Sequence, residues 1–213
     1  MPLILAFDAT AGRCATAVYR DDARLAERVE AMDRGHAERL FPLIEDCLSA
    51  AGCAPDDLDV IAACTGPGNF TGIRISVSAA RGLALSLGIP AVGVNLFDAL
   101  AEEAELPALL SLPAPRDHLY VQLRTPDHTG DIAIAPFDSL PACPSGTRAI
   151  GARSDEVASQ TGLTRTPARY APASAIARIA ARRFPTETNR PTPLYIRTPD
   201  AAPASTPPVK ILP

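Results

Sequence analysis

Residues 60–94, VIAACTGPGNFTGIRISVSAARGLALSLGIPAVGV, contain the pattern that decides the fold of this chain. The segment begins with the apolar run Val60–Cys64 and ends with a second apolar run, Ala91–Val94. Between them lies a loop with three glycines in seven residues, and then a series of apolar side chains at helical spacing. The members of this series are Ile73, Val77, Ala80, Ala84 and Leu87. Gly88 and Pro90 are typical of a helix end. The segment therefore predicts a strand, a glycine loop, a helix and a second strand parallel to the first.

The glycine loop, residues 66–72, allows two interpretations. Glycine adopts positive φ and lets a ligand or another stretch of backbone approach closely. In the functional interpretation, N–H groups at the helix start bind an anion or a nucleotide phosphate. In the structural interpretation, the glycines permit close packing and set the angle of the helix, and Thr71 is its expected N-cap. The candidate contact residues are Gly66, Gly68, Asn69, Thr71 and Gly72.

The residues before this segment predict three antiparallel strands and a helix. Leu3–Phe7 suits a strand that is buried on both faces, and Ala15–Tyr19 and Arg24–Glu30 follow it across tight turns. A helix is expected over residues 36–51, because its apolar side chains form one continuous face. That face consists of Leu40, Leu43, Ile44, Cys47, Leu48 and Ala51, and Gly52 is placed to end the helix.

The second half of the chain predicts shorter elements. After Asn95, a helix of about eight residues, Asp98–Glu105, is expected to close the first half. A connection with one strand, a hairpin, a further strand and two helices are expected after residue 105. Their expected ranges are Leu109–Leu112, His118–Arg124, Ile132–Ala135, Ala149–Gly151, 155–161 and 173–184. From residue 185 onward, eight prolines in 29 residues exclude a helix or a central strand. Leu194–Arg197 is expected to dock as a short extended piece.

Composition and charge are those of an ordinary soluble globular protein, with 47% apolar and 21% charged residues. The net charge of −4 gives no general reason to expect nucleic-acid binding. The charge is uneven, however, with a net −8 over residues 1–105 and +4 over residues 106–213. The only lysine is Lys210, which removes a P-loop lysine or a Schiff-base lysine from consideration.

Cysteine usage and the absence of long apolar runs indicate a cytoplasmic protein. The five cysteines contain no C-x-x-C pair and are expected to be small buried side chains in a reducing compartment. The first apolar run reaches only to Asp8, too short for a signal peptide. No run approaches the ~18 residues that span a bilayer, so no membrane contact is expected.

Five motifs together resemble one family. They are ILAFDAT (4–10), HAERLFPLIE (36–45), GPGNFTGIRISVSAARGLA (66–84), IPAVGVNLFDALA (89–101) and PLYIR (193–197). The chain resembles the bacterial TsaB (YeaZ) family across residues 3–105, and only thinly over 106–190. The resemblance implies an α/β protein with the actin-like ATPase (ASKHA, ribonuclease-H-like) fold, in which two lobes carry mixed sheets and the second lobe is abbreviated.

The expected domain organisation follows from this fold. Residues 1–105 form the N-terminal lobe, residues 106–198 the smaller C-terminal lobe, and residues 199–213 a proline-rich tail. The last helix, residues 173–184, is expected to pack back on the first lobe.

The resemblance also implies a function. Members of the family are the non-catalytic partners of the transferase TsaD, with which they form a heterodimer. With the ATPase TsaE, the pair supports formation of N6-threonylcarbamoyladenosine in tRNA. We therefore expect a dimerisation and activating subunit that meets tRNA through the complex, forms a possible homodimer when alone, and needs no cofactor.

Two departures from catalytic relatives argue against chemistry by this chain itself. Actin-like ATPases and kinases usually carry D-x-G-T in the first hairpin, whereas Asp8 is followed here by Ala9, Thr10 and Ala11. Where the related transferase has two metal-binding histidines, this chain has Leu96 and Leu100. The three histidines lack the spacing of metal ligands, and no G-x-S-x-G motif supports a hydrolase or protease. No catalytic residue and no metal site are expected.

Two alternatives remain open at this point. A free-standing actin-like ATPase or small-molecule kinase would use Asp8, through a hydrated Mg²⁺, and the glycine loop. A carboxylate that caps its own turn is the simpler interpretation of Asp8. Direct binding of tRNA by the arginine-bearing second half is the other alternative, for which solvated arginines are the simpler explanation.

The two amphipathic helices are expected to form the partner interface. Together, these helices carry more apolar and small side chains than are needed to cover one short sheet. Pairing with equivalent helices of TsaD, or of a second copy, would give a four-helix interface with an apolar centre. The expected interface residues are His36, Leu40, Leu43, Ile44, Cys47, Arg74, Val77, Ala80 and Ala84.

Overall fold

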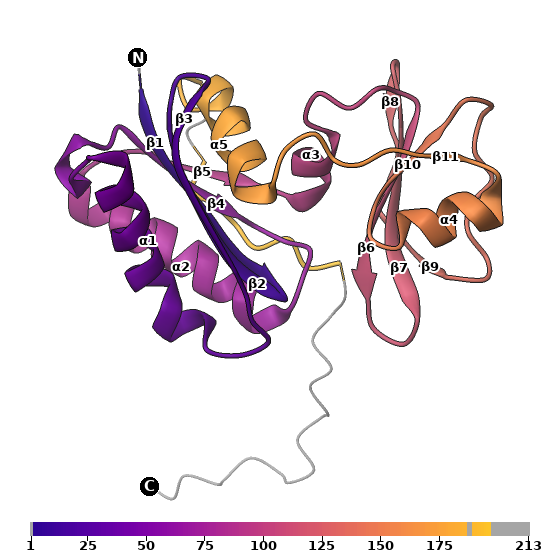
Figure 1. Ribbon diagram of the computed structural model, residues 1–213, viewed down its shortest axis with the longest axis horizontal. Helices are drawn as coiled ribbons and strands as arrows, with labels where there is room; N and C mark the ends of the chain where they lie inside the picture. Colours follow the sequence, from indigo (N-terminus) through magenta and orange to yellow (C-terminus); the bar gives the residue numbers. More distant parts are fainter. Residues whose placement is uncertain (1, 187–188, 197–213) are drawn as a thin grey trace, which may run out of the picture.

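The computed structural model describes residues 2–186 and 189–196, and contains two β-sheets with helices packed against them. Figure 1 shows the sheets beside each other, with α1 and α2 on one side of the first sheet and α5 on its other side. The predicted tail, residues 199–213, and Arg197 lie outside the described residues. The α/β architecture agrees with the expected fold class.

The first sheet has the strand order β3-β2-β1-β4-β5. β1 (Leu3–Ala11), β2 (Arg13–Arg20) and β3 (Ala23–Ala31) form the predicted antiparallel meander. β4 (Val60–Cys64) runs parallel to β1, and β5 (Ala91–Val94) runs parallel to β4, as the pattern of residues 60–94 predicts.

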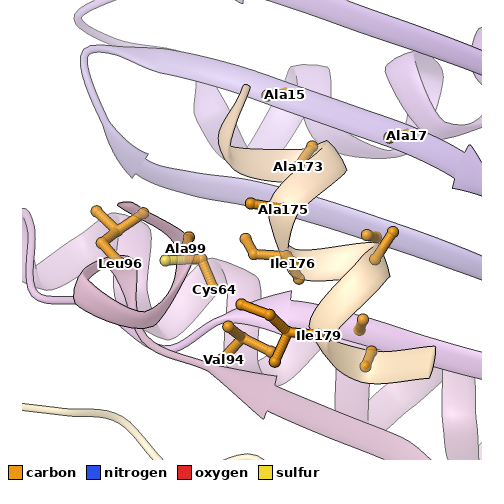
Figure 2. Packing of buried hydrophobic residues seen from close by; sticks show 14 of the residues in the cluster. Ala15, Ala17, Cys64, Val94, Leu96, Ala99, Ala173, Ala175, Ile176 and Ile179 are labelled. Carbon is orange, nitrogen blue, oxygen red and sulfur yellow. The ribbon is translucent and has the colours of Figure 1, made fainter. Parts of the chain in front are cut away.

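Both faces of β1 are buried, and alternate side chains point to different helices. Leu3, Leu5 and Phe7 pack with α1 (His36–Ala51) and α2 (Phe70–Leu87). Ile4 and Ala6 belong to the opposite core with α5 (Pro172–Arg183), where Ile176 and Ile179 lie over Cys64 and Val94 (Figure 2). α5 follows the second sheet in the chain and yet contacts β1, β2, β4 and β5 of the first sheet.

The second sheet has the order β11-β10-β6-β7-β8, with β9 paired to the free part of β7. It consists of β6 (Ala108–Ala114), β7 (His118–Thr125), β8 (His128–Thr129), β9 (Ala133–Pro136), β10 (Arg148–Gly151) and β11 (Thr164–Arg165). α4 (Ser154–Thr161) closes its small core. The predicted hairpin and the strand near residue 150 are confirmed, whereas β11 has only two residues and leaves no readable pattern.

Two helix starts differ from the prediction because asparagines cap them. α2 begins at Phe70, where Asn69 Oδ1 accepts a hydrogen bond from the Gly72 N–H at 2.7 Å, so the expected Thr71 cap is wrong. α3 spans Leu96–Ala101 rather than residues 98–105, since Asn95 Oδ1 accepts from the Asp98 N–H at 2.9 Å. A short 3₁₀ helix, η1 (Pro55–Asp57), precedes β4.

The cysteines behave as small core side chains. All five are free thiols; Cys14, Cys47 and Cys64 are fully buried, as predicted, whereas Cys53 and Cys143 are only partly buried, so the prediction is wrong for these two. Burial raises the pKa of the Cys14 thiol to about 11, helped by the nearby carboxylates of Asp8 and Glu30. Within residues 2–186 and 189–196, no helix combines the length and apolarity needed to cross a bilayer.

Candidate functional site

A cavity of about 770 Å³ lies between the β1–β2 turn, the glycine loop and the second sheet. Thr10 and Arg13 come from the first hairpin, Asn69 from the glycine loop, and Leu112 and Tyr120 from the second sheet. The cavity borders the first hairpin and the glycine loop, the two segments that the enzyme alternative would use. The chemistry of the two loops at its edge therefore decides whether this chain could hold phosphate there.

Asp8 is committed to its own turn. The side chain is fully buried, and its Oδ1 accepts hydrogen bonds from the Thr10 N–H at 2.8 Å and the Thr10 hydroxyl at 2.6 Å. Arg13 Nη2 lies 3.6 Å from Asp8 Oδ2. Oδ1 thus takes the capping role that a D-x-T sequence favours, whereas Oδ2 has no hydrogen-bond partner in the described residues and is neutralised only by the Arg13 guanidinium. No group of three or more His, Cys, Asp or Glu side chains in the described part of the chain could hold a metal.

The glycine loop is pressed against the backbone of β1. The Asn69 N–H donates to the Thr10 carbonyl oxygen at 2.8 Å, and a Cβ atom at position 68 would lie 2.1 Å from that same oxygen. At Gly72, a Cβ atom would lie 2.0 Å from the Ala9 carbonyl oxygen. Both glycines thus permit a close approach between parts of this chain. The geometry supports the packing interpretation of the loop rather than the phosphate interpretation.

Two of the three histidines, His36 and His118, contact backbone carbonyl oxygens of this chain. His36 is buried at the start of α1, where its Nε2 lies 2.9 Å from the Ala11 carbonyl oxygen and holds the turn at the cavity edge. His118 Nδ1 lies 2.6 Å from the Arg116 carbonyl oxygen. Neither arrangement resembles a base held against a serine or cysteine nucleophile.

An acidic side chain on α3 connects the two sheets. Asp98 Oδ1 accepts from Arg124 Nη2 of β7 at 2.6 Å, and its Oδ2 accepts from Arg183 Nη2 of α5 at 2.7 Å. Next to it, the buried Glu102 carboxylate accepts two hydrogen bonds from Arg182. Burial alone would raise the pKa of Asp98, but the hydrogen bonds from Arg183 and Arg124 outweigh it, and the pKa is lowered.

Replacement of this carboxylate tests the connection. Asp98→Asn is expected to lower the free energy of unfolding at pH 7 by about 2 kcal/mol, because two arginines lose a charged acceptor. A lowered carboxyl pKa contributes stability that is present above pH 3.8 and is lost as the pH falls through the folded-state value. The variant should therefore lose part of the acid dependence between about pH 5 and 3 in urea unfolding. An unchanged pH profile would contradict the assigned role of Asp98.

Most of the predicted interface residues are in the core, and that prediction is wrong for them. Seven apolar members are buried within this chain, and all except Val77 belong to the core between the helices and the first sheet: Leu40, Leu43, Ile44, Cys47, Val77, Ala80 and Ala84. His36 is also buried, and among the nine only Arg74 is exposed. The physical reason is that each helix has one apolar stripe, and covering the sheet already uses it.

The outward side of α1 and α2 instead carries a groove of about 400 Å³ that the sequence analysis missed. We call it the α1/α2 groove; it is lined by Ala37, Phe41, Ile75, Ser78, Ala79, Gly82, Leu83 and Ser86. Phe41 remains 46% exposed there although it is a large aromatic residue. Two sequence signals could have found the groove: a phenylalanine off the core stripe, and small residues at 78, 82 and 86, four apart on the outer face.

The arrangement of strands and helices identifies the structural class of this protein. The two mixed sheets place this protein among those with the actin-like ATPase (ASKHA) fold, and its first hairpin and glycine loop contact each other. The same fold occurs in the activator of 2-hydroxyisocaproyl-CoA dehydratase from Clostridium difficile, at 8% identity, with a TM-score of 0.58 over 86% of this chain and 96% of that chain.

Sequence comparison then identifies the family. A family model described as TsaD, tRNA N6-adenosine threonylcarbamoyltransferase, matches residues 25–169. The tRNA threonylcarbamoyladenosine biosynthesis protein TsaB of Escherichia coli is 35% identical over 101 residues, which is 47% of this chain and 43% of that protein. An uncharacterized Mycobacterium tuberculosis protein, Rv3421c, is 32% identical over 94% of both chains. The match thus spans less than half the length of the curated TsaB relative.

Structural comparison agrees with the sequence. A Pseudomonas aeruginosa protein described as similar to peptidase YEAZ superposes with a TM-score of 0.74 at 25% identity, covering 92% of this chain and all of that chain. The chain belongs to the TsaB (YeaZ) family, as the five motifs indicate.

Proposed function

We propose that this protein is a non-catalytic subunit of the cytoplasmic assembly that makes N6-threonylcarbamoyladenosine in tRNA. In this proposal it dimerises with a TsaD-type transferase, activates it, and works with a TsaE-type ATPase. The names of its relatives support the pathway, and the family resemblance supports the two partners. The single observation that carries a subunit role is the exposed, apolar α1/α2 groove.

The groove has the properties of a protein-binding surface. Phe41 and Leu83 offer apolar contact area, while Ser78, Gly82 and Ser86 leave room for another helix to approach closely. Apolar side chains at the centre of a surface and aromatic enrichment are typical of protein interfaces. The partner is expected to place two amphipathic helices along α1 and α2, which would complete a four-helix arrangement.

Affinity purification of the tagged full-length chain from its native cells, expressed at its normal level, tests the proposal. We expect a TsaD-type and a TsaE-type protein to be recovered together, in amounts comparable to the bait. Depletion of the chain should reduce threonylcarbamoyladenosine in tRNA, measured by mass spectrometry of nucleosides. An unchanged level of the modified nucleoside after depletion would refute the proposed function.

The alternative, an ATPase or kinase based on Asp8, has a separate test. We expect the purified chain to show no Mg²⁺-dependent hydrolysis of ATP above a buffer control, because Asp8 and the glycine loop are bound to Thr10 and β1. Hydrolysis that disappears in Asp8→Asn while the variant remains folded by circular dichroism would instead establish the enzyme alternative.

A further inference from the structure

Residues 189–196, which we call the C-terminal strap, run along α2 and return to the glycine loop. At one end, Arg81 Nε of α2 donates to the Pro191 carbonyl oxygen at 2.8 Å. Further on, the Leu194 N–H donates to the Thr65 carbonyl oxygen at 2.8 Å, directly before the glycine loop. The strap therefore brings Tyr195, far away in the sequence, to the first turn of α2.

Tyr195 and Phe70 hold the side chain of Arg74. The guanidinium carbon lies 3.9 Å from the centroid of the Phe70 ring, and Nε donates to the Tyr195 hydroxyl at 3.3 Å. The two aromatic rings are 4.9 Å apart. Because a freely rotating arginine loses conformational entropy when it binds, an arginine that is already held in place binds at a lower entropic cost.

The guanidinium of Arg74 has N–H groups without a hydrogen-bond acceptor in the described residues. Arg74 uses only Nε, and no carboxylate of the described residues lies within 4.0 Å of its nitrogens. Arg124 and Arg182, by contrast, both have carboxylate partners within this chain. α2 itself contains no acidic residue that could neutralise Arg74. Arg74 is thus an exposed cation with a fixed position and without an internal partner in the described part of the chain.

The residues around Arg74 indicate what class of molecule would bind there. Arg74 lies one helical turn before Ser78, which lines the α1/α2 groove, so the arginine stands at the groove edge. Phe70 and Tyr195 are 37% and 40% exposed beside it. Arginine and aromatic residues next to an apolar centre are the usual strong contacts of protein interfaces. A phosphate backbone would need several cations, whereas residues 1–105 carry a net charge of −8.

We propose that Arg74 receives a carboxylate of the protein that docks in the α1/α2 groove, and that Tyr195 of the C-terminal strap is a positioning residue for that contact. Both Nη groups are available to form paired hydrogen bonds with an Asp or Glu side chain, the geometry that arginine favours. The inference rests on the proposed function, because it assumes that a partner protein occupies the groove. It adds the chemistry of the recognition and gives the strap a role.

The test measures the affinity of the purified chain for its purified TsaD-type partner by calorimetry, between about 50 and 500 mM NaCl. Arg74→Gln is expected to weaken binding about 20-fold at low salt and to flatten the salt dependence. Arg74→Lys should recover only part of the loss, because an ammonium lacks the paired geometry. Tyr195→Ala should weaken binding about 5-fold and Tyr195→Phe about 2-fold, since the latter keeps the ring.

Three controls separate this role from a structural one. Arg28→Gln removes an exposed arginine that donates only to the Glu27 carbonyl oxygen, and should leave affinity unchanged. A chain that ends at Ile196 retains the strap and should bind like the full-length chain. The thermal midpoint of Arg74→Gln should stay within about 2 °C of the wild type, because surface changes rarely cost more than ~0.5 kcal/mol.

The outcomes distinguish this inference from the proposed function. If Arg74→Gln binds as tightly as wild type while a charge in the groove abolishes binding, the inference is wrong and the proposed function stands. If neither change alters binding, the partner docks on another surface and the inference is wrong, whereas a wild-type chain that does not bind the TsaD-type partner would refute the proposed function. A variant that keeps its affinity for the protein but loses a gel shift with tRNA would overturn the inference in favour of a phosphate contact.

Discussion

Gly72→Ala is expected to lower the free energy of unfolding by roughly 3–5 kcal/mol, enough to leave little folded protein at 37 °C. A Cβ atom at this position would lie 2.0 Å from the Ala9 carbonyl oxygen and 3.0 Å from its carbon. Ala9 is fully buried, and its N–H is itself held by the Ser76 hydroxyl at 3.0 Å. The first turn of α2 would therefore have to move away from β1, breaking the contact that joins them.

Gly82 provides a matched control on the same helix. A Cβ atom there would have no heavy atom within 4 Å, so Gly82→Ala should stabilise the protein by about 0.5–1 kcal/mol through helix propensity. Urea unfolding followed by circular dichroism measures both variants. Equal stabilities for Gly72→Ala and wild type would show that the loop does not need its close approach to β1, and would reopen the phosphate interpretation.

Phe41→Glu is expected to abolish binding to the TsaD-type partner, with a loss of at least 100-fold in affinity. A charge placed at the apolar centre of an interface must be buried without a partner, which costs several kcal/mol. The fold should survive, because Phe41 is 46% exposed and lies off the core stripe of α1. Co-purification and calorimetry with the partner give the two readouts, and circular dichroism checks the fold.

Ile134→Glu is the control for this experiment. Ile134 on β9 is 40% exposed, so the same change introduces the same charge at similar exposure on the second sheet. Binding to the partner should be unaffected. If Ile134→Glu weakens binding as much as Phe41→Glu does, the effect comes from the charge rather than from the groove. Binding that survives in Phe41→Glu would place the partner on another surface.

The strands and helices of the first sheet could largely be predicted from local pattern. The hydrophobic periodicity of residues 36–51 and the pattern of residues 60–94 indicate where their helices and strands begin and end. Gly52 and Gly88, both in the left-handed conformation, end α1 and α2. Short elements such as β11 could not be predicted, because two residues carry no period. The N-cap of α2 lies two residues before the predicted Thr71, because Asn69 and Thr71 are both acceptable N-caps and only the backbone decides between them.

The functional surface was harder to predict. A helical stripe of apolar residues shows that one face of a helix is covered, but not whether the cover is this chain or another protein. The residues from Leu40 to Ala84 that were assigned to a partner are therefore in the core, and the partner-facing candidates are their less conspicuous neighbours Phe41 and Gly82. Distance along the chain hides the remaining features: Asp98 meets Arg183, and Arg74 meets Tyr195, only after folding.

The sequence by itself determined the family, the order of strands and helices in the first half, and the departures from catalytic motifs at Thr10, Leu96 and Leu100. These properties depend on residues that are close together in the sequence, so motifs and hydrophobic periodicity reveal them. Only the tertiary structure decided which face of α1 and α2 is free, what the glycines approach, and how the C-terminal strap holds Arg74. Those answers depend on burial and on contacts between distant residues, and a linear pattern contains neither.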